Sequence, residues 1–502
     1  MDAIVAAFAN VLTPINLGGL IFGVAVGIVI GALPGLSVNM GIALLFPLTF
    51  SFQGIGGILM LLGIYCGAIY GGSISAILLK TPGTPASAAT TLDGYPMAVK
   101  YGQPGRALGL STFSSTFGGM FSAICLMVFS PMLAAVALQF SKPEYFALAV
   151  FGISIITSVS SGSVLKGLMG GLIGLIIATI GIDAMSGQIR MTFGTTYLLG
   201  GLSFVPILIG LFAFSQVLTS IEESYNETYV KHDINIKRVF PTMSDLKECI
   251  VTVLRSSVIG TFVGCIPGTG GDISSFISYN EAKRWSKHKE KFGDGAPEGI
   301  CAPEAGNNAV SGGAMIPMLT LGIPGSAPAA LFLSAMILHG VRPGPTLFTE
   351  HAETVYTMII GFAVINLLMY FVGMFYCKAG SMILKIPKAI LATSIVVLAV
   401  VGTFATNKNM FDVWVMFASG VIGYIMIRND FPIAPIALSL LLGSNMEKAW
   451  SVTKTLYEGE LYMIFTRPLA AILALLTIAS FAFPIIKMWR KRKAAAAKTE
   501  AK

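Results

Sequence analysis

Long runs without charged side chains divide this chain from end to end. No Asp, Glu, Lys or Arg occurs between Asp2 and Lys80. Each run holds about 20 residues or more, the length with which a helix crosses about 30 Å of hydrocarbon. Backbone groups in lipid need internal partners, so we expect helices, and the alternation typical of β-barrel strands is missing. Charged residues bound six further runs: 106–142, 190–222, 304–342, 353–378, 388–408 and 467–487.

The apolar pattern predicts a series of embedded segments, several of which are too short to span a bilayer. We interpret the short ones as half-helices or re-entrant hairpins and expect roughly 10–13 crossings. The predicted fold class is an all-α polytopic membrane protein. The segments lie at about 16–33, 38–52, 55–79, 107–138, 144–160, 164–182, 196–219, 249–266, 305–322, 327–341, 354–377, 387–406, 411–427, 431–443 and 466–486.

Composition and charge agree with a membrane protein and indicate its sidedness. Only 11% of the residues are charged, against about 25% in soluble domains. The loop 283–291 and the tail 487–493 are rich in Lys and Arg, so the positive-inside rule places both in the cytoplasm. The N-terminus has neither, which favours the outside. We expect an N-terminal membrane repeat (1–220), a polar linker (221–248), a C-terminal membrane repeat (249–486) and a basic cytoplasmic tail (487–502).

Three landmarks recur in the same order in the two halves. Pro34-Gly35 is matched by Pro267-Gly268, Gly71-Gly72 by Gly312-Gly313, and Pro82-Gly83 by Pro324-Gly325. Internal repeats whose broken helices meet near the midplane are common in transporters. With the N-terminus outside, the sequence predicts two inverted structural repeats.

The two Pro-Gly breaks are the predicted substrate-handling tips. Prolines beside a glycine cannot sit in an uninterrupted helix, and the free N–H groups at a helix start can bind an anion. A loop at the membrane surface is the alternative. Lys80 is the nearest cation, and we favour its extension to the interface over contact with a carboxylate. The candidate residues are Thr81, Pro82, Gly83, Thr84 and Ser87 in the first tip, and Pro324, Gly325 and Ser326 in the second.

Polar residues after the first Pro-Gly landmark of each half suggest a cation site. Asn39 and Asp272 fall one position apart in a simple alignment, and their oxygens suit Na⁺, which like other hard cations prefers oxygen ligands. Alternatively, Asn39 makes an interhelical hydrogen bond and Asp272 marks the cytoplasmic boundary. The candidate cation-binding residues are Gly35, Ser37, Asn39, Gly268, Asp272 and Asn307, and Asn39 is also a candidate for substrate.

A third polar cluster opens the charge-free run that begins at residue 304. Glu304, Asn307 and Asn308 lie within about one helical turn. We expect Asn307 and Asn308 to contact substrate. Glu304 is interpreted either as a group that neutralises a cation or takes part in proton coupling, or as an ordinary acidic first turn of a helix.

The sequence contains no motif of a catalytic or nucleotide-binding site. HExxH, GxSxG and GxxxxGK[ST] are all missing, and the six cysteines and four histidines show no metal-ligand spacing. We therefore expect no enzyme activity, no cofactor and no metal beyond Na⁺. Transport would draw its energy from an ion gradient.

At these motifs the chain resembles a known family, the large membrane subunits of the tripartite tricarboxylate transporters (TctA family). The resemblance rests on stretches within 31–36, 70–89, 93–97, 264–271, 292–313 and 321–326. It implies the bacterial inner membrane, a periplasmic solute-binding protein, a small four-helix membrane subunit, uptake coupled to Na⁺ without ATP, and an elevator-type architecture.

The leading interpretation is a secondary transporter subunit that takes up a tricarboxylate or dicarboxylate delivered by the binding protein. A channel, or a partner-independent organic-anion symporter, is the alternative. Rings of charged side chains, which many channels use, are missing from the sequence. The residues leave open which carboxylate is carried and whether the chain forms a homo-oligomer.

Overall fold

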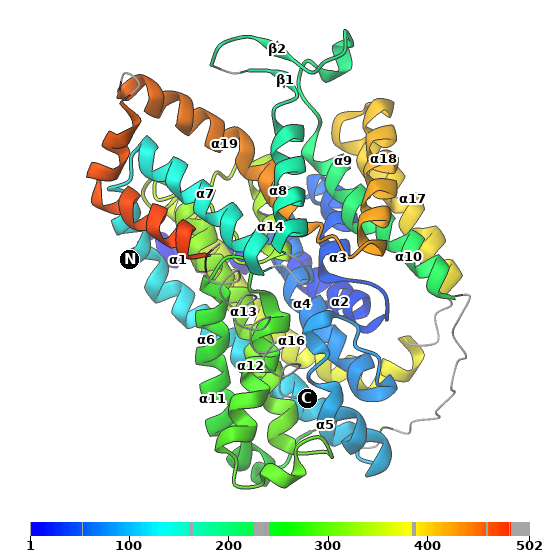
Figure 1. Ribbon diagram of the computed structural model, residues 1–502. Coiled ribbons are helices and arrows are strands. Elements are labelled where there is room, and N and C mark those ends of the chain that lie inside the picture. The colour runs from blue at the N-terminus through cyan, green and yellow to red at the C-terminus, as the bar shows by residue number, and fades with distance from the viewer. Residues whose placement is uncertain are drawn as a thin grey trace, which may run out of the picture. The chain divides into compact units, whose positions relative to one another are not determined.

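Helices form nearly all of the described chain. The computed structural model describes residues 2–52, 54–159, 164–183, 185–224, 236, 240–383, 388–457, 460–480 and 482. Within these ranges one short antiparallel hairpin pairs β1 (Gly181–Ile182) with β2 (Ile189–Arg190), as Figure 1 shows. The predicted all-α class is confirmed. The predicted tail 487–502 lies outside the described residues, as do 225–235 and 237–239 of the linker.

Unit 1 is a compact group of helices that joins residues 1–138 to 205–424. Its first part contains α1 (Asp2–Val11), α2 (Pro14–Ala32), α3 (Val38–Leu45), η1 (Phe46–Ser51), α4 (Gly56–Leu79), η2 (Pro85–Ser87), α5 (Thr91–Tyr95), η3 (Pro96–Lys100) and α6 (Pro104–Ala137). Its second part contains α9 (Phe204–Leu208), η5 (Ile209–Phe214), α10 (Ser215–Ser224), α11 (Met243–Cys265), α12 (Gly270–Trp285), η6 (Lys289–Lys291), α13 (Pro297–Leu321), α14 (Ala327–Leu338), α15 (Leu347–Glu350), α16 (Ala352–Ile383), α17 (Lys388–Asn407) and α18 (Met410–Arg428).

Unit 2 comprises residues 139–204 and 425–502. It contains α7 (Lys142–Val159), α8 (Val164–Ala178), the β1–β2 hairpin, η4 (Thr196–Leu198), α19 (Ala434–Leu456) and η7 (Leu461–Thr466). Ion pairs Arg190–Glu447 and Arg467–Glu144 tie its two chain segments together. Each unit takes residues from both predicted halves of the sequence, 1–220 and 249–486.

Eight helices or helical runs in the described chain are long and apolar enough to cross a membrane. Large apolar side chains such as Phe262 on α11, Phe371 on α16 and Val397 on α17 lie exposed on them, as a lipid-facing surface requires. The finding confirms a polytopic membrane protein. The eight are Pro14–Ala32, Gly56–Leu79, Pro104–Ala137, Phe204–Glu222, Met243–Cys265, Ala352–Lys378, Ile390–Asn407 and Met410–Arg428.

Close backbone contact between α2 and α4 forms the centre of the first half (Figure 1). Glycines on both helices make this approach possible, because a methyl group at Gly31 would lie 2.1 Å from the Ala68 carbonyl oxygen. A methyl group at Gly71 would lie 2.3 Å from the Ile28 carbonyl oxygen. Small residues let membrane helices pack without a gap. Helix α4 is consequently buried over almost its whole length.

The same arrangement recurs between α11 and α13 in the second half. A methyl group at Gly264 would lie 2.5 Å from the Val310 carbonyl oxygen, and one at Gly313 would lie 2.2 Å from that of Thr261. The α4 and α13 positions match when Gly83 is aligned with Gly325, so that Gly71 pairs with Gly313, and the α2 and α11 positions match when Pro34 is aligned with Pro267. In that register Asn39 and Asp272 coincide, because each comes five residues after its proline. The expected one-position shift was therefore wrong, since no residue is inserted between landmark and polar side chain.

Candidate functional site

Both long buried helices end in a left-handed residue that is followed by a Pro-Gly tip. Helix α4 ends at Lys80 with φ 61°, and α13 ends at Gly322 with φ 73°. The two positions correspond, so the chain leaves each helix by the same backbone turn. Glycine adopts this conformation easily, whereas lysine adopts it at a cost. The Lys80 side chain is exposed and lies over the Tyr95 ring at 5.7 Å, away from the tip.

Tip 1 (Thr81–Ser87) is held closely against α4. Gly83 donates its backbone N–H to Gly72 oxygen at 3.2 Å, and a methyl group at Gly83 would lie 2.0 Å from the Gly31 carbonyl oxygen. The hydroxyl of Ser87 donates to Thr84 oxygen at 2.8 Å, and the Thr84 N–H donates to Ser87 Oγ at 3.3 Å. Thr84 and Ser87 are buried. These hydrogen bonds fix the tip's shape.

Tip 2 (Pro324–Ser326) opens helix α14. Ser326 caps this helix by accepting the Ala329 N–H at 3.3 Å. In the described part of the chain, the backbone N–H groups of Gly325, Ser326 and Ala327 make no hydrogen bond. The tip is anchored by its Gly325 carbonyl oxygen, which accepts the Gly268 N–H at 2.9 Å. Three consecutive free N–H groups at a helix start are suited to an anion.

Each tip packs against elements of the other half. Helix α14 lies on α3, and η2 of tip 1 lies on the first turn of α12. The Tyr65 hydroxyl of α4 lies 3.2 Å from Ser326 Oγ. A methyl group at Gly271 would lie 2.2 Å from Asn307 Oδ1 and 3.2 Å from Ala86 Cβ. Tip 2 therefore meets α3 and α4, and tip 1 meets α12 and α13.

Two of the predicted asparagines are buried or half-buried without partners. In the described chain, Asn39 Oδ1 and both Asn307 side-chain atoms, Oδ1 and Nδ2, are buried and make no hydrogen bond. Most buried polar atoms are hydrogen-bonded, so each exception calls for an explanation. Asn308 differs, because its amide donates to Glu304 oxygen at 3.1 Å within its own helix. Asn39 and Asn307 thus have polar atoms free for a ligand, and Asn308 contributes to α13.

Other predicted positions lie at the edges of these contacts. Thr81 is exposed, and its hydroxyl donates to Leu79 oxygen at 3.4 Å. Asp272 is exposed in the first turn of α12, and Ser37 caps α3 by accepting the Met40 N–H at 3.2 Å. Gly35 and Gly268 have left-handed φ values of 89° and 82°. The structure therefore brings Ser87, Ser326 and Asn307 into the inter-half contacts, keeps Thr84 against Gly72 and Ser87 of its own half, and leaves Thr81 exposed.

Glu304 lies inside a cage of hydroxyl groups. Its side chain is fully buried. Thr90 donates to Oε1 at 2.5 Å, and Ser73 and Ser115 donate to Oε2 at 2.6 Å and 2.8 Å. These donors come from α4, from the residue before α5, and from α6. Of the two interpretations from sequence, an ordinary acidic first turn does not fit, because Glu304 is in the third turn of a helix that starts at Pro297.

Asp93 fastens the segment that follows tip 1 to the second half. Its Oδ1 accepts the N–H groups of Gly293, Gly295 and Ala296 at 2.9, 2.8 and 2.7 Å, and its Oδ2 accepts the Tyr279 hydroxyl at 2.8 Å. Burial raises the pKa of this carboxyl. Four hydrogen bonds from one loop and one helix make Asp93 the firmest link between the halves in this region.

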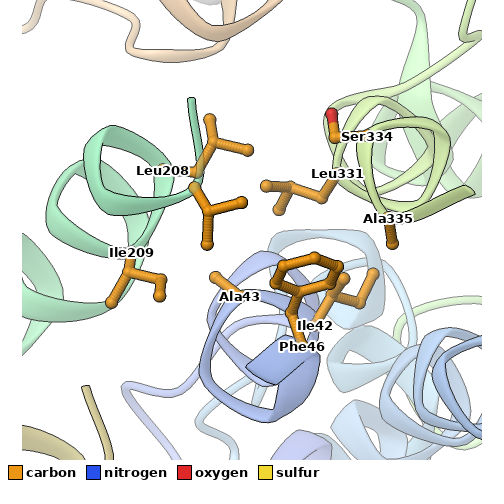
Figure 2. A pocket seen from close by; sticks show the side chains of 9 residues that line it. Ile42, Ala43, Phe46, Leu208, Ile209, Leu331, Ser334 and Ala335 are labelled. Atoms are coloured by element: carbon orange, nitrogen blue, oxygen red, sulfur yellow. The ribbon is translucent and has the colours of Figure 1, made fainter. Parts of the chain in front are cut away.

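A small apolar pocket lies beside tip 2. Figure 2 shows Phe46 and Ile42 of α3 facing Leu331 of α14, with Leu208 and Ile209 on the third side. Its empty space is ≈ 230 Å³, below the roughly 300–1,000 Å³ of typical ligand pockets. Ser334 is the polar residue on its wall. The residues that line the pocket include no charged group that could bind a carboxylate.

Tyr65 and the hydroxyls around Glu304 were not among the sequence-predicted site residues. Tyr65 lies 18 residues before Gly83, and Asn307 lies 18 residues before Gly325. That equal spacing could have identified Tyr65 as a site residue, because the repeat aligns it with Asn307, which the sequence had already suggested. Ser73, Thr90 and Ser115 carried no such signal, since serine and threonine are common in membrane helices as packing residues.

Known proteins similar to this chain place it in a transporter family. The model of the tripartite tricarboxylate transporter TctA family matches residues 17–438. An Agrobacterium vitis protein, described as an uncharacterized 52.8 kDa protein in the TAR-I ttuC' 3' region, is 37% identical over 487 residues, covering 97% of this chain and 96% of the relative. A second protein of that organism, described as an uncharacterized protein in the TAR-II ttuC' 3' region, is 35% identical over 212 residues, covering 42% of this chain and 88% of the relative. No solved structure matches. The matched residues include most of the membrane-crossing helices, both tips and the Glu304 cage. On that basis the chain belongs to the tripartite tricarboxylate transporter TctA family.

Proposed function

We propose that this chain moves a carboxylate, delivered by a periplasmic solute-binding protein, across the bacterial inner membrane in symport with Na⁺. The family makes it a subunit of a tripartite tricarboxylate transporter, which has further subunits. The proposed partners are the binding protein and a small four-helix membrane subunit, and the proposed substrate is a tricarboxylate or dicarboxylate.

The free N–H groups of tip 2 carry this proposal. A carboxylate accepts hydrogen bonds through two oxygens, and the tip offers the N–H groups of Gly325, Ser326 and Ala327 beside the Ser326 and Tyr65 hydroxyls. The positive end of the α14 dipole favours the negative charge. No cationic side chain is needed, because the donors are preorganised in a site shielded from water.

A coupling cation fits the neutral and acidic oxygens that lie nearby. Asn39 Oδ1 and Asn307 Oδ1 are without partners in the described chain. Hard cations take amide, carboxylate and backbone oxygens as ligands. A Na⁺ gradient would then supply the energy for transport by this chain. Asp272 of α12 stands at the position equivalent to Asn39 and supplies the negative charge that the first half lacks.

The division into units supports an elevator-type mechanism. Every residue predicted to handle substrate or cation lies in unit 1, between positions 35 and 326. In an elevator, one compact body carries the site while another stays fixed. We assign unit 1 the carrying role, and unit 2 would be the body that stays fixed.

Uptake into right-side-out or reconstituted vesicles, with the binding protein supplied on the outside, tests the proposal. The complete system contains this chain, the small subunit, the binding protein and its radiolabelled carboxylate ligand. We expect uptake that stops when the Na⁺ gradient is dissipated and when the binding protein is omitted. Uptake that continues without the binding protein would favour a partner-independent symporter, and continuous single-channel current would favour a channel.

Variants of tip 2 test the site itself. Ser326→Ala removes one donor to the carboxylate, and Tyr65→Phe removes the hydroxyl beside it. Each should lower uptake by roughly five- to 150-fold, since a lost hydrogen bond to a charged group is worth about 1–3 kcal/mol. Thr81→Ala is the matched control, because Thr81 is an exposed tip hydroxyl outside the contacts. Equal uptake by all three variants would contradict the assignment.

A further inference from the structure

Glu304 is a buried carboxylate without a positive partner. It is 0% exposed, and three hydroxyl groups donate to it. Within the described ranges no Lys, Arg or His forms an ion pair with it. Hydroxyl donors satisfy the oxygen lone pairs, but they leave the net negative charge in place. A buried charge is costly unless it is paired or coordinates a metal ion.

The hydroxyl donors stabilise the ionised form of this side chain, which burial by itself disfavours. An ionised carboxylate only accepts hydrogen bonds, and here all three neighbours can donate. A protonated Glu304 would turn one oxygen into a donor, and one hydroxyl would have to give up its bond to the carboxyl and accept instead. Hydrogen bonds to the charged form stabilise that form. The hydroxyl donors therefore offset part of the cost of burying the charge, and a bound cation would offset more of it.

The neighbouring oxygens suit a hard cation. Ser73, Thr90 and Ser115 can each rotate and present a lone pair, because a hydroxyl carries one proton and two lone pairs. The set contains no nitrogen or sulfur ligand, which excludes the preferences of zinc and copper. Its single negative charge matches one monovalent cation. Ligands of this kind are the ones that alkali and alkaline-earth ions take.

A fourth hydroxyl provides an independent observation. Ser111 lies on α6 one turn before Ser115 and faces the same carboxylate. Its Oγ is 0% exposed and makes no hydrogen bond of ordinary geometry in the described chain, but it lies close enough to the Glu304 carboxyl to interact with it. A hydroxyl buried in this way loses its bonds to water without recovering them. Ser111 thus adds a fourth buried hydroxyl oxygen to the oxygens that surround this carboxylate.

We propose that Glu304 is the charge-neutralising ligand of a Na⁺ site completed by the hydroxyls of Ser73, Ser111, Ser115 and Thr90. The inference rests on the proposed function, which requires a coupling ion, and it locates a site apart from Asn39 and Asp272. Na⁺ enters the cage as the hydroxyls turn their protons away from the carboxylate.

The position of the cage links ion binding to tip 1. Thr90 lies three residues after Ser87, and Ser73 follows Gly72, which accepts the Gly83 N–H. Asn307, whose amide faces Gly271 and Ala86, lies one turn after Glu304 on α13. A cation held by Glu304 and Thr90 pulls the tip segment and α13 toward one charge. Filling the cage therefore orders tip 1 before the carboxylate binds.

Thermal unfolding of the purified full-length chain tests the site directly. The unfolding midpoint is followed in detergent as NaCl replaces choline chloride at constant ionic strength, without substrate or partner proteins. We expect Na⁺ to raise the wild-type midpoint, and Glu304→Gln to raise the half-saturating Na⁺ concentration at least tenfold. Glu298→Gln is the matched control, because Glu298 lies on the same helix and accepts hydroxyls from Thr252 and Ser286. Its Na⁺ response should equal that of the wild type.

The double variant Ser111→Ala/Ser115→Ala keeps the carboxylate and decides the question if Glu304→Gln does not fold. It should weaken the Na⁺ response at least threefold. The inference is overturned if Na⁺ does not change the wild-type unfolding midpoint. It is also overturned if the Glu304→Gln midpoint depends on Na⁺ concentration in the same way as the wild-type midpoint. The latter result leaves Na⁺-coupled uptake intact, with the ion at Asn39 or Asp272. Uptake that needs no Na⁺ gradient refutes the proposed function separately.

Discussion

Replacing Gly31 by alanine should separate α2 from α4 and displace tip 1. The added methyl carbon would lie 2.1 Å from Ala68 oxygen and 2.8 Å from Ala68 carbon. An ordinary contact needs at least 3.4 Å, so the helices must part by about 1 Å at their closest point. Overpacking of this kind costs about 1–3 kcal/mol, while alanine returns up to about 1 kcal/mol of helix propensity.

The midpoint of thermal unfolding measures the net effect. A thiol-reactive fluorophore reports the exposure of the buried cysteines on unfolding, with Cys66 on α4 among them. We expect Gly31→Ala to lower the midpoint by roughly 2–8 °C. The uptake rate should fall by more than the loss of folded protein explains, because the Gly31 carbonyl oxygen lies directly against Gly83 of tip 1. Gly18→Ala is the control on the same helix, since a methyl group there meets nothing within 4 Å. A Gly31→Ala midpoint at or above that of Gly18→Ala would refute the packing argument.

Three further changes give distinct outcomes. Asp93→Asn keeps the shape of a side chain that accepts four hydrogen bonds but removes its charge. It should lower the free energy of unfolding, measured by denaturant titration, by about 2 kcal/mol. An unchanged free energy would show that Asp93 does not hold the two halves together. Hydrogen bonds from Lys100 and Tyr101 lower the pKa of Asp294, so this group stabilises the fold above the unfolded carboxyl pKa of about 3.9 and loses that effect as the pH falls through the lower folded value. Asp294→Asn should therefore flatten the acid limb of the midpoint-versus-pH curve, and an unaltered limb would contradict this. Asn307→Ala deletes two buried polar atoms that make no hydrogen bond in the described chain. Uptake should fall at least tenfold, while the unfolding midpoint stays at or above that of the wild type. A lower midpoint with normal uptake would indicate that Asn307 is a packing residue.

The spacing of charges along the chain was sufficient to predict the membrane helices. Lipid tolerates few charges and no unpaired backbone groups, so the pattern maps directly onto structure. The tips were predictable for a similar reason, because two prolines beside a glycine leave few alternatives to a break. Local chemistry decides both features. Neither depends on which distant residues come together.

The Glu304 cage could not be predicted from local sequence patterns. Ser73 and Glu304 are separated by 231 positions along the chain, and Ser115 and Glu304 by 189. Their approach depends on how α4, α6 and α13 pack, which no local pattern encodes. The compact units were equally hidden, because residues 139–204 leave the first half to join 425–502. Tyr65 lies between these cases, since the repeat register pointed to it but the contact with Ser326 needed the structure.

The repeat places equivalent side chains at positions that are chemically different. Tyr65 and Asn307 correspond in the two halves, and each faces the tip of the opposite half. Tyr65 offers a hydroxyl to a tip with three free N–H groups, whereas Asn307 brings two unpartnered amide atoms to a tip whose Thr84 N–H is already occupied. The free N–H groups suit tip 2 to the proposed carboxylate, while tip 1 ends three residues before Thr90, which donates to the Glu304 carboxylate of the proposed cation site. Under the proposed function, this divergence would let one repeated architecture couple two ligands of opposite charge, with the polar partner of each tip supplied by the opposite half.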